Sequence, residues 1–417
     1  MLSNLQSDNQ VNYRGNLLLI LLIISVAFFL KFGIPVAGSQ IFFSFLIVSG
    51  VTAYGFLAGI LKVHAGRLAA YAICMGVLSL TQLANLYSFS LLSLIMIWLI
   101  HFPYIFELNK GEAEPGIELK FLRKVVAILA VLGIAQYFLQ FVIGAYWAFF
   151  VDHIVPNQFI MQSFYGLRPM HYGSPYYKPT AFFQLEPANF SQLLALAIII
   201  EMLFFKNLKL IALYLVAIAL TFSGTGLIPL LLIAPLVLVY QKKFAIFGVV
   251  ILALLTAPLW SLFVGLDKTV SRADEVFDKN SSGYARFVSP YVTIKENQIP
   301  EGFEKVFLGM GAGTLNDVDT SEYESATSTW GKLFYEYGTL GTIIYLLFFG
   351  YCIFSSRKDK FIIATLMIIF WILGEHLFPP IVHNLLFALL IWPTEKFEFK
   401  AENSETGNSI ESNLEKT

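Results

Sequence analysis

About a dozen long apolar runs occupy most of the 417 residues of this chain. Runs of 18 or more apolar residues are typical of helices that cross a membrane. Hydrophobic residues make up 57% of the chain and charged residues 13%, whereas a soluble domain carries about 25% charged residues. The sequence therefore predicts an all-α integral membrane protein. Its net charge of −1 and the lack of a basic patch do not indicate binding of nucleic acid.

The apolar runs predict about twelve transmembrane helices, connected mostly by short loops. Two polar stretches, 151–185 and 265–329, are much longer than the rest. Residues 1–15 form a short polar N-terminus, and residues 394–417 form a polar tail that we expect to be disordered. The expected helices are 16–35, 40–61, 67–86, 89–107, 124–148, 187–205, 210–223, 226–240, 244–264, 331–354, 361–378 and 380–393. The turn at 223–226 is consistent with a simple reversal or with the floor of an outward-facing cavity.

Lysine and arginine are distributed unevenly between the two ends of these helices. With the N-terminus placed inside, 17 of the 27 Lys and Arg residues lie inside, and 8 of the other 10 lie in the two long loops. Long loops have little influence on orientation, so the short loops decide it. Among them Lys31 is the clear exception, and we expect it to reach the outer interface. Both termini are therefore expected in the cytoplasm and both long loops outside.

The first outer loop carries many aromatic and basic side chains in the stretch from Tyr165 to Gln192, where the sequence is YGLRPMHYGSPYYKPTAFFQLEPANFSQ. This density of aromatic residues, Pro and Gly predicts an ordered loop. The tyrosines can stack on sugar rings, although interfacial tyrosines also contact lipid headgroups. The cationic groups can bind anions or transfer protons. The tyrosines are Tyr165, Tyr172, Tyr176 and Tyr177, and the basic residues are Arg168, His171 and Lys178.

Glu186 stands directly before Pro187, where the sixth helix is expected to begin. Proline suits the first turn of a helix, and an acidic residue before it interacts favourably with the positive end of the helix dipole. Two interpretations follow. Glu186 either caps the helix or accepts the proton of a hydroxyl group at the membrane surface. The dipole favours its ionised form, which suits a proton acceptor but weakens its basicity.

Two arginines in the second outer loop, Arg272 and Arg286, are candidates for binding phosphate. The planar guanidinium group can hold two phosphate oxygens at once, so arginines from two loops would suit a diphosphate. An ordinary surface ion pair is the alternative. Arg286 lies in an amphipathic segment with Phe287 and Tyr291. The glycine-rich stretch 309–313 is not a nucleotide-binding P-loop, because no Gly-Lys-Ser/Thr follows it.

Further ionisable residues fall within or beside the apolar runs. Glu375, His376 and His383 are expected near the outer ends of the last two helices, as functional groups or as a hydrogen-bonded structural set. Glu201 and His101 are expected at the inner interface. Cys74 and Cys352 lie in apolar runs, so neither a disulfide nor a metal site is expected. No acidic pair indicates a metal, and no cofactor is predicted.

Five segments, taken in order, resemble the bacterial O-antigen polymerase/O-antigen ligase superfamily of membrane glycosyltransferases. The resemblance covers roughly residues 120–390. The segments are KPTAFFQLEPANFSQ (178–192), TFSGTGLIPLLL (221–232), GYARFVSPYVTI (283–294), FLGMGAGTL (307–315) and STWGKLFYEYGTLGTIIYL (328–346). Two departures are evident. Lys178 stands where the family has arginine, and Thr327 or Ser328 takes the place of a loop histidine that is common in ligases.

The resemblance implies a GT-C-like fold in the bacterial inner membrane and a metal-independent, inverting transfer of glycan on the periplasmic face. The donor would be an undecaprenyl-diphosphate-linked oligosaccharide, and the product an O-antigen, capsule or exopolysaccharide. Candidate partners are the lipid bilayer, a chain-length regulator and a flippase. The residues expected to bind the diphosphate or the glycan are Arg168, Lys178, Arg272, Arg286, Tyr172 and Tyr177. Glu186 or His171 would act on the acceptor.

Three functions remain open at this point. A polymerase of repeat units is favoured, because the missing loop histidine counts against the ligase branch. A ligase that transfers glycan to lipid A-core is the first alternative. A transporter or flippase is the second, and it would predict ionisable residues in the middle of the membrane together with inverted repeats.

Overall fold

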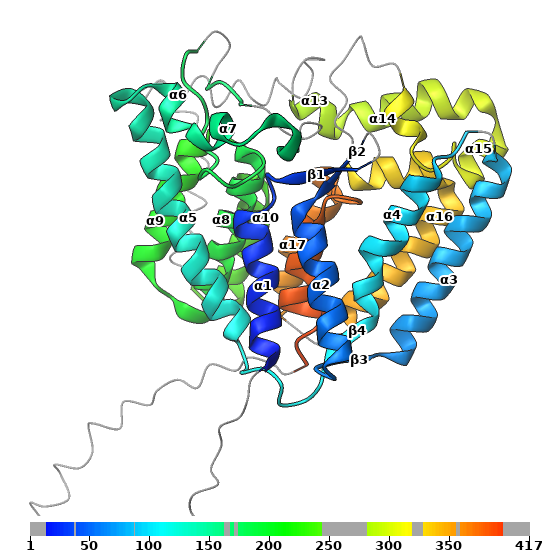
Figure 1. Ribbon diagram of the computed structural model, residues 1–417, viewed down its shortest axis with the longest axis horizontal. Helices are drawn as coiled ribbons and strands as arrows, with labels where there is room; N and C mark the ends of the chain where they lie inside the picture. Colours follow the sequence, from blue (N-terminus) through cyan, green and yellow to red (C-terminus); the bar gives the residue numbers. More distant parts are fainter. Residues whose placement is uncertain are drawn as a thin grey trace, which may run out of the picture.

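The computed structural model describes residues 14–36, 39–86, 88–161, 167–170, 174–243, 282–318, 328–355 and 359–394. Within these ranges the chain is mostly helical, and its helices are packed side by side in a bundle (Figure 1). The prediction of a mainly α-helical chain is therefore confirmed. The predicted helix 244–264 lies outside the described residues. Each of the other eleven predicted ranges contains a helix.

Four of the described helices are long and apolar enough to cross a membrane. They are α3 (Ala65–Thr81, continued by a 3₁₀ turn to Asn85), α5 (Ile117–Val142), α8 (Pro187–Ile200, continued by a π turn to Phe205) and α16 (Thr329–Phe354). The other apolar helices are shorter. They are α1 (Arg14–Phe28), α2 (Phe43–Leu57), α4 (Leu91–His101, with a 3₁₀ turn to Ile105), α9 (Leu208–Thr221), α10 (Leu227–Tyr240), α17 (Lys360–Ile372) and α18 (Pro380–Leu386, with a π turn to Ile391).

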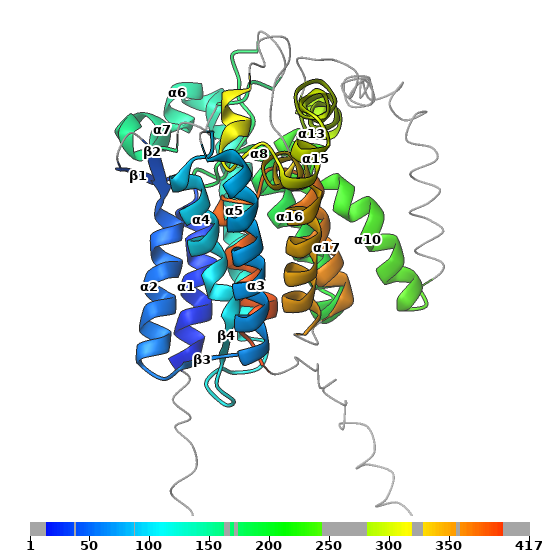
Figure 2. The same cartoon turned by 90° about the vertical axis from the view of Figure 1, so that its right-hand side faces the viewer.

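The two ends of the bundle differ (Figures 1 and 2). The end that we call upper carries short helices and a hairpin: β1 (Gly33–Val36), β2 (Ser39–Phe42), α6 (Ala145–Ala148), α7 (Phe150–Ile154), α13 (Ser282–Phe287), α14 (Ser289–Thr293) and α15 (Phe303–Leu308). The lower end carries the pair β3 (Leu61–Val63) and β4 (Phe106–Leu108). The described parts of both long polar loops therefore share the upper end.

The β1–β2 hairpin occupies residues that the sequence assigns to two helices. The strands are antiparallel, with Gly33 opposite Phe42. Helix α1 ends at Phe28, and Pro35 cannot donate the hydrogen bond that a longer helix would need. Lys31 precedes the hairpin. Its side chain is fully buried and forms a 2.7 Å ion pair with Asp152 of α7, so the prediction that it reaches the outer interface is wrong.

Helix α5 is displaced along the chain from its predicted range of 124–148. It begins at Ile117, so its first two turns include Glu118, Lys120 and Arg123. It ends at Val142, ahead of Gly144, whose φ of +86° favours glycine. Charged residues in the first turns and a glycine after the last explain this shift of nearly two turns.

Helix α16 is broken at Gly338, whose φ/ψ of 66°/−170° is not helical. A Cβ atom at Gly338 would lie 2.4 Å from the carbonyl oxygen of Phe307. The break therefore lets the end of α15 dock against the helix. The part of α16 before the break, Thr329–Tyr337, contributes to the upper end.

Candidate functional site

Glu186 lies between two arginines that come from different loops. One of its carboxylate oxygens is 3.5 Å from the Arg168 guanidinium, and the other is 3.8 Å from the Arg286 guanidinium. The side chain of Arg168 is 53% exposed, whereas those of Arg286 and Glu186 are 14% and 19% exposed. Three residues that the sequence singles out, spread over more than 100 positions, therefore meet at the upper end of the bundle.

Glu186 is the N-cap residue of α8, and Pro187 is the first residue of that helix. The backbone of Glu186 is extended, with φ/ψ of −141°/159°, and its side chain makes no capping hydrogen bond. The simple capping interpretation is therefore wrong for the side chain. Its carboxylate turns to the two arginines instead.

Short backbone pairings order the segment that leads to Glu186. The Lys178 amide donates to the Arg168 carbonyl oxygen at 2.9 Å, and the Met170 amide donates to the Tyr176 carbonyl oxygen at 2.9 Å. Gln140 of α5 binds both backbone groups of Tyr177, at 2.9 and 3.0 Å. Lys178 is thus held beside Arg168 by the backbone, in keeping with the predicted ordered loop.

Ala181 and Phe182 adopt left-handed backbone conformations, with φ values of 50° and 67°. Such conformations cost about 1–2 kcal/mol for each residue other than glycine, so the surrounding contacts must hold them. Gln136 accepts hydrogen bonds from the amides of Thr180 and Phe182, at 2.8 and 3.3 Å. Gln184 donates to two carbonyl oxygens of α1, at 3.0 and 2.8 Å. Buried glutamines therefore fix the sharp turn that precedes Glu186.

The turn at 223–226 packs on the first turns of α8. The Ser191 hydroxyl accepts a hydrogen bond from the Gly226 amide at 3.1 Å and lies 3.2 Å from the Thr225 hydroxyl. A Cβ atom at Gly226 would lie 2.3 Å from the Ser191 carbonyl oxygen, so only glycine allows this approach. The described turn is a reversal that braces the helix of Glu186.

A second charged group combines Glu375, which the sequence singled out, with Lys332 and Glu336 from the first part of α16, which it did not. Lys332 is buried, 3.9 Å from Glu375 and 4.0 Å from Glu336, and its ammonium group lies 4.6 Å from the centre of the Phe378 ring. Glu375 also accepts hydrogen bonds from the amides of Leu377 and Phe378. A lysine and a glutamate four residues apart within a predicted apolar helix are the signal that could have revealed this group.

His376 lies beside this group, in the connection between α17 and α18. Its amide donates to the Thr329 hydroxyl at 2.9 Å, and the Thr329 amide donates to the Gly374 carbonyl oxygen at 3.0 Å. The connection is therefore fastened to the start of α16. Burial, then His383 and then Arg286 lower the pKa of the His376 imidazole.

Other predicted site residues have different positions. Tyr177 is half-buried and forms a T-shaped ring contact with Phe149, with ring centroids 5.7 Å apart. His171, Tyr172 and Arg272 lie outside the described residues. Of the predicted set, Arg168 and Arg286 form ion pairs with Glu186. The backbone amide of Lys178 donates to the Arg168 carbonyl oxygen.

The glycine-rich stretch 309–313 packs against α16 and the end of α3. Gly309, Gly311 and Gly313 all have positive φ. The amides of Met310 and Gly311 donate to the carbonyl oxygens of Tyr335 and Glu336, at 2.8 and 3.1 Å. Ala312 donates to the Gln82 side chain at 2.7 Å. These amides are engaged within the protein, so this stretch is not a phosphate-binding loop.

A polar network in the middle of the bundle contains His101 and His383, both fully buried. His101 is 2.7 Å from the Ile97 carbonyl oxygen and 2.6 Å from the Tyr345 hydroxyl. His383 is 2.8 Å from the Tyr104 hydroxyl and 3.2 Å from the Leu377 carbonyl oxygen. His101 is fully buried within the protein. Glu201 is also buried, and it is paired with Arg123 at 2.5 Å.

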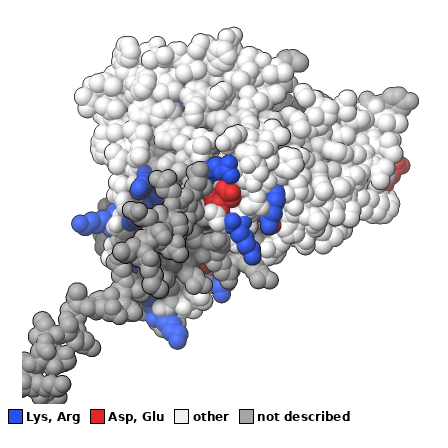
Figure 3. Space-filling model, turned by 60° about the horizontal axis from the view of Figure 1, so that its bottom comes forward, with Lys and Arg blue, Asp and Glu red and all other residues white. Residues whose placement is uncertain are grey.

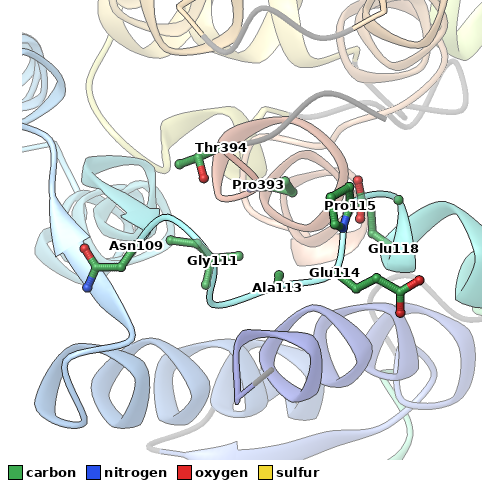
Figure 4. A pocket seen from close by; sticks show the side chains of 10 residues that line it. Asn109, Gly111, Ala113, Glu114, Pro115, Glu118, Pro393 and Thr394 are labelled. Carbon is green, nitrogen blue, oxygen red and sulfur yellow. The ribbon is translucent and has the colours of Figure 1, made fainter. Parts of the chain in front are cut away.

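Two cavities of the described structure lie at the lower end, away from the charged clusters. One has a volume of about 10 Å³ and is lined by residues that include Asn109, Glu114 and Pro393 (Figure 4). It holds at most one water molecule. The other, of about 390 Å³, is lined by Leu203, Phe204, Lys206, Tyr240, Gln241, Lys243 and Asp359. Lys and Arg side chains gather on this lower face (Figure 3).

The upper cluster has the components that an anionic leaving group requires: guanidinium groups, a buried ammonium group and a buried imidazole within one region. Preorganised cations stabilise negative charge that develops on a leaving group. Among the described residues, no group of three or more His, Cys, Asp or Glu side chains could hold a metal ion. Comparison of the chain with models of known protein families, with curated proteins and with solved structures found no match.

Proposed function

We propose that the chain is a membrane glycosyltransferase that polymerises undecaprenyl-diphosphate-linked oligosaccharide repeat units. In this proposal its apolar helices, about twelve in all, span the bacterial inner membrane in a GT-C-like arrangement, and the upper end faces the periplasm. The observation that carries the proposal is the convergence of Arg168 and Arg286, from two separate polar loops, on Glu186. Two guanidinium groups held at one point suit the two phosphates of a polyprenyl diphosphate.

The proposed reaction is an inverting displacement at the anomeric carbon of the donor. The bond between that carbon and the diphosphate breaks, and negative charge develops on the diphosphate, where the arginines stabilise it. A hydroxyl group of the acceptor repeat unit attacks from the opposite face and loses its proton to a base. The donor carries its own leaving group, so neither a nucleotide sugar nor ATP is required.

Purified protein and lipid-linked glycan extracted from the native host test this function, without ATP, nucleotide sugar or added metal. A ladder of longer lipid-linked oligomers is the expected result. Folded protein that gives no ladder, but transfers glycan to an added lipid A-core acceptor, would instead be a ligase. Protein that moves the lipid-linked glycan across a vesicle membrane without lengthening it would be a transporter. His101 and His383, in the middle of the bundle, do not favour a transporter, because each of their ring nitrogens has a hydrogen-bond partner.

The proposed orientation has its own test. Ser174→Cys at the upper end is expected to react with a membrane-impermeant thiol reagent in intact spheroplasts. Asn207→Cys, at the N-cap of α9, is the matched lower-end control and is expected to react only after the membrane is permeabilised. Labelling of Asn207→Cys alone in intact spheroplasts would reverse the proposed orientation.

A further inference from the structure

Glu186 is poorly suited to accept a proton from the acceptor sugar. Each of its carboxylate oxygens faces a guanidinium group, and the start of α8 adds positive potential. Both carboxylate oxygens are therefore already engaged in ion pairs. Glu186 therefore suits the role of positioning the two arginines, and the base must be sought elsewhere in the upper cluster.

Three histidines are buried among the described residues, and they differ in their hydrogen bonds. His101 and His383 each have partners at both ring nitrogens. His376 is 2% exposed, and neither of its ring nitrogens has a hydrogen-bond partner among the described residues. Buried polar groups in folded proteins nearly always have a partner, so such an exception requires an explanation. A bound substrate that completes the bonds of the ring is one.

The position of His376 agrees with this explanation. Its backbone is fixed to Thr329, and Arg286, which contacts Glu186, acts on its ring. Of the neighbouring carboxylates, Glu375 accepts two amide hydrogen bonds and faces Lys332. Glu336 lies 4.0 Å from Lys332, and neither of its oxygens has a hydrogen-bond partner among the described residues. The imidazole of His376 and the carboxylate of Glu336 are thus the side chains of this cluster that retain hydrogen-bonding capacity for a ligand, and of the two the imidazole is the one on which Arg286 acts.

We propose that His376 is the catalytic base that takes the hydroxyl proton of the acceptor sugar, an assignment that rests on the proposed polymerase function. As the acceptor oxygen bonds to the anomeric carbon, its proton passes to a ring nitrogen of His376. The bond from the anomeric carbon to the diphosphate oxygen breaks, and its electron pair leaves with the diphosphate. The imidazolium then returns its proton to water, so that the ring is neutral for the next cycle.

The test compares the wild type with His376→Gln in lipid nanodiscs, using lipid-linked glycan extracted from the native host, between about pH 5.5 and 9. Loss of a general base is expected to slow polymerisation by about 10²–10⁴-fold at pH 7, while binding of undecaprenyl diphosphate is retained. The wild-type rate is expected to stay level down to about pH 5.5, because burial, His383 and Arg286 disfavour protonation of the ring, and the variant is expected to be slower at every pH. His153→Gln is the matched control, because His153 is an exposed upper-end histidine stacked on Tyr146.

Several charged or titratable groups surround His376 and could contribute to the pH profile. They are Arg286, Glu186, Lys332, Glu336, Glu375 and His383. Comparison of the two profiles separates His376 from these groups, since all of them remain in the variant. A His376→Gln variant that polymerises at the wild-type rate would overturn the assignment while leaving the polymerase function intact. Folded wild-type protein that binds undecaprenyl diphosphate but makes no polymer would overturn both.

A second measurement applies if His376→Gln does not fold. Wild-type protein is treated with diethylpyrocarbonate, and mass spectrometry follows modification at each histidine. Loss of polymerisation is expected to parallel modification of His376 and to be reversed by hydroxylamine, and undecaprenyl diphosphate is expected to slow the modification. Inactivation that parallels another histidine, or full activity with His376 modified, would contradict the proposal.

Discussion

The polar network in the middle of the bundle and the charged cluster at its upper end contain similar residues but differ in how completely those residues are bonded. In the middle, His101, Tyr345, Tyr104 and His383 form hydrogen bonds of 2.6–2.8 Å. At the upper end the ion pairs of Glu186 and Lys332 are 3.5–4.0 Å long, and His376 has no ring partner among the described residues. The first arrangement suits a fixed structural role. The second leaves bonding capacity for a ligand.

The buried pair of Lys31 and Asp152 resembles the network in the middle of the bundle, because it is short and fully buried. We expect its loss to have the largest effect on stability. Asp152→Ala leaves the buried ammonium group of Lys31 without its partner, which costs about 3–5 kcal/mol of unfolding free energy. Thermal unfolding in detergent measures the change. The double variant Lys31→Met/Asp152→Leu is the control, and it should recover most of the loss because no buried charge remains. If Asp152→Ala were as stable as the wild type, the pair would have no structural role.

Arg286 should show the opposite behaviour, with a large effect on activity and a small one on stability. Loss of a charge-assisted contact costs about 1.5–3 kcal/mol, so Arg286→Ala is expected to slow polymerisation by about 10–100-fold. Arg286→Lys should restore activity only in part, because the planar fork is lost. Lys295→Ala, an exposed cation of the same loop, serves as control. Wild-type polymer from well-expressed Arg286→Ala would reduce Arg286 to a structural ion pair.

Tyr345 tests the core network without changing its volume much. Tyr345→Phe removes the hydroxyl group that bonds to His101, and a buried group left without a partner costs about 1–3 kcal/mol. The unfolding temperature is expected to fall, while the rate per folded molecule stays at the wild-type value. A variant of unchanged stability with a reduced rate would place this network in the reaction and weaken the comparison drawn above.

Arg168 should have the smallest effect of the four. Its side chain is 53% exposed, and an exposed ion pair contributes at most about 1 kcal/mol. Arg168→Ala is therefore expected to slow polymerisation by no more than about fivefold and to leave the unfolding temperature unchanged. Raised ionic strength should reduce the difference between variant and wild type, because salt screens exposed charges. An effect as large as that of Arg286→Ala would mean that substrate binding buries Arg168.

The sequence predicted much of the helical fold because apolar helices are local features. A run of apolar residues is visible without knowledge of its neighbours, and Pro187 and Gly144 mark helix ends by their own backbone preferences. The β1–β2 hairpin and the burial of Lys31 were not predicted. Both depend on partners distant in the chain, since Asp152 lies 121 residues from Lys31. Apolar composition alone does not distinguish a strand of four residues from the end of a helix.

For the candidate site, the sequence by itself determined the participants: arginines in two polar loops and a glutamate before a proline. These residue types indicate a functional site, because guanidinium and carboxylate groups are rare in a largely apolar chain and their burial costs free energy. Only the tertiary structure decided that Glu186 faces both arginines, that Lys332 lies 3.9 Å from Glu375, and that His376 alone among the described buried histidines has no ring partner. Hydrogen-bond satisfaction depends on which distant segments pack together, and no local pattern of residues records it.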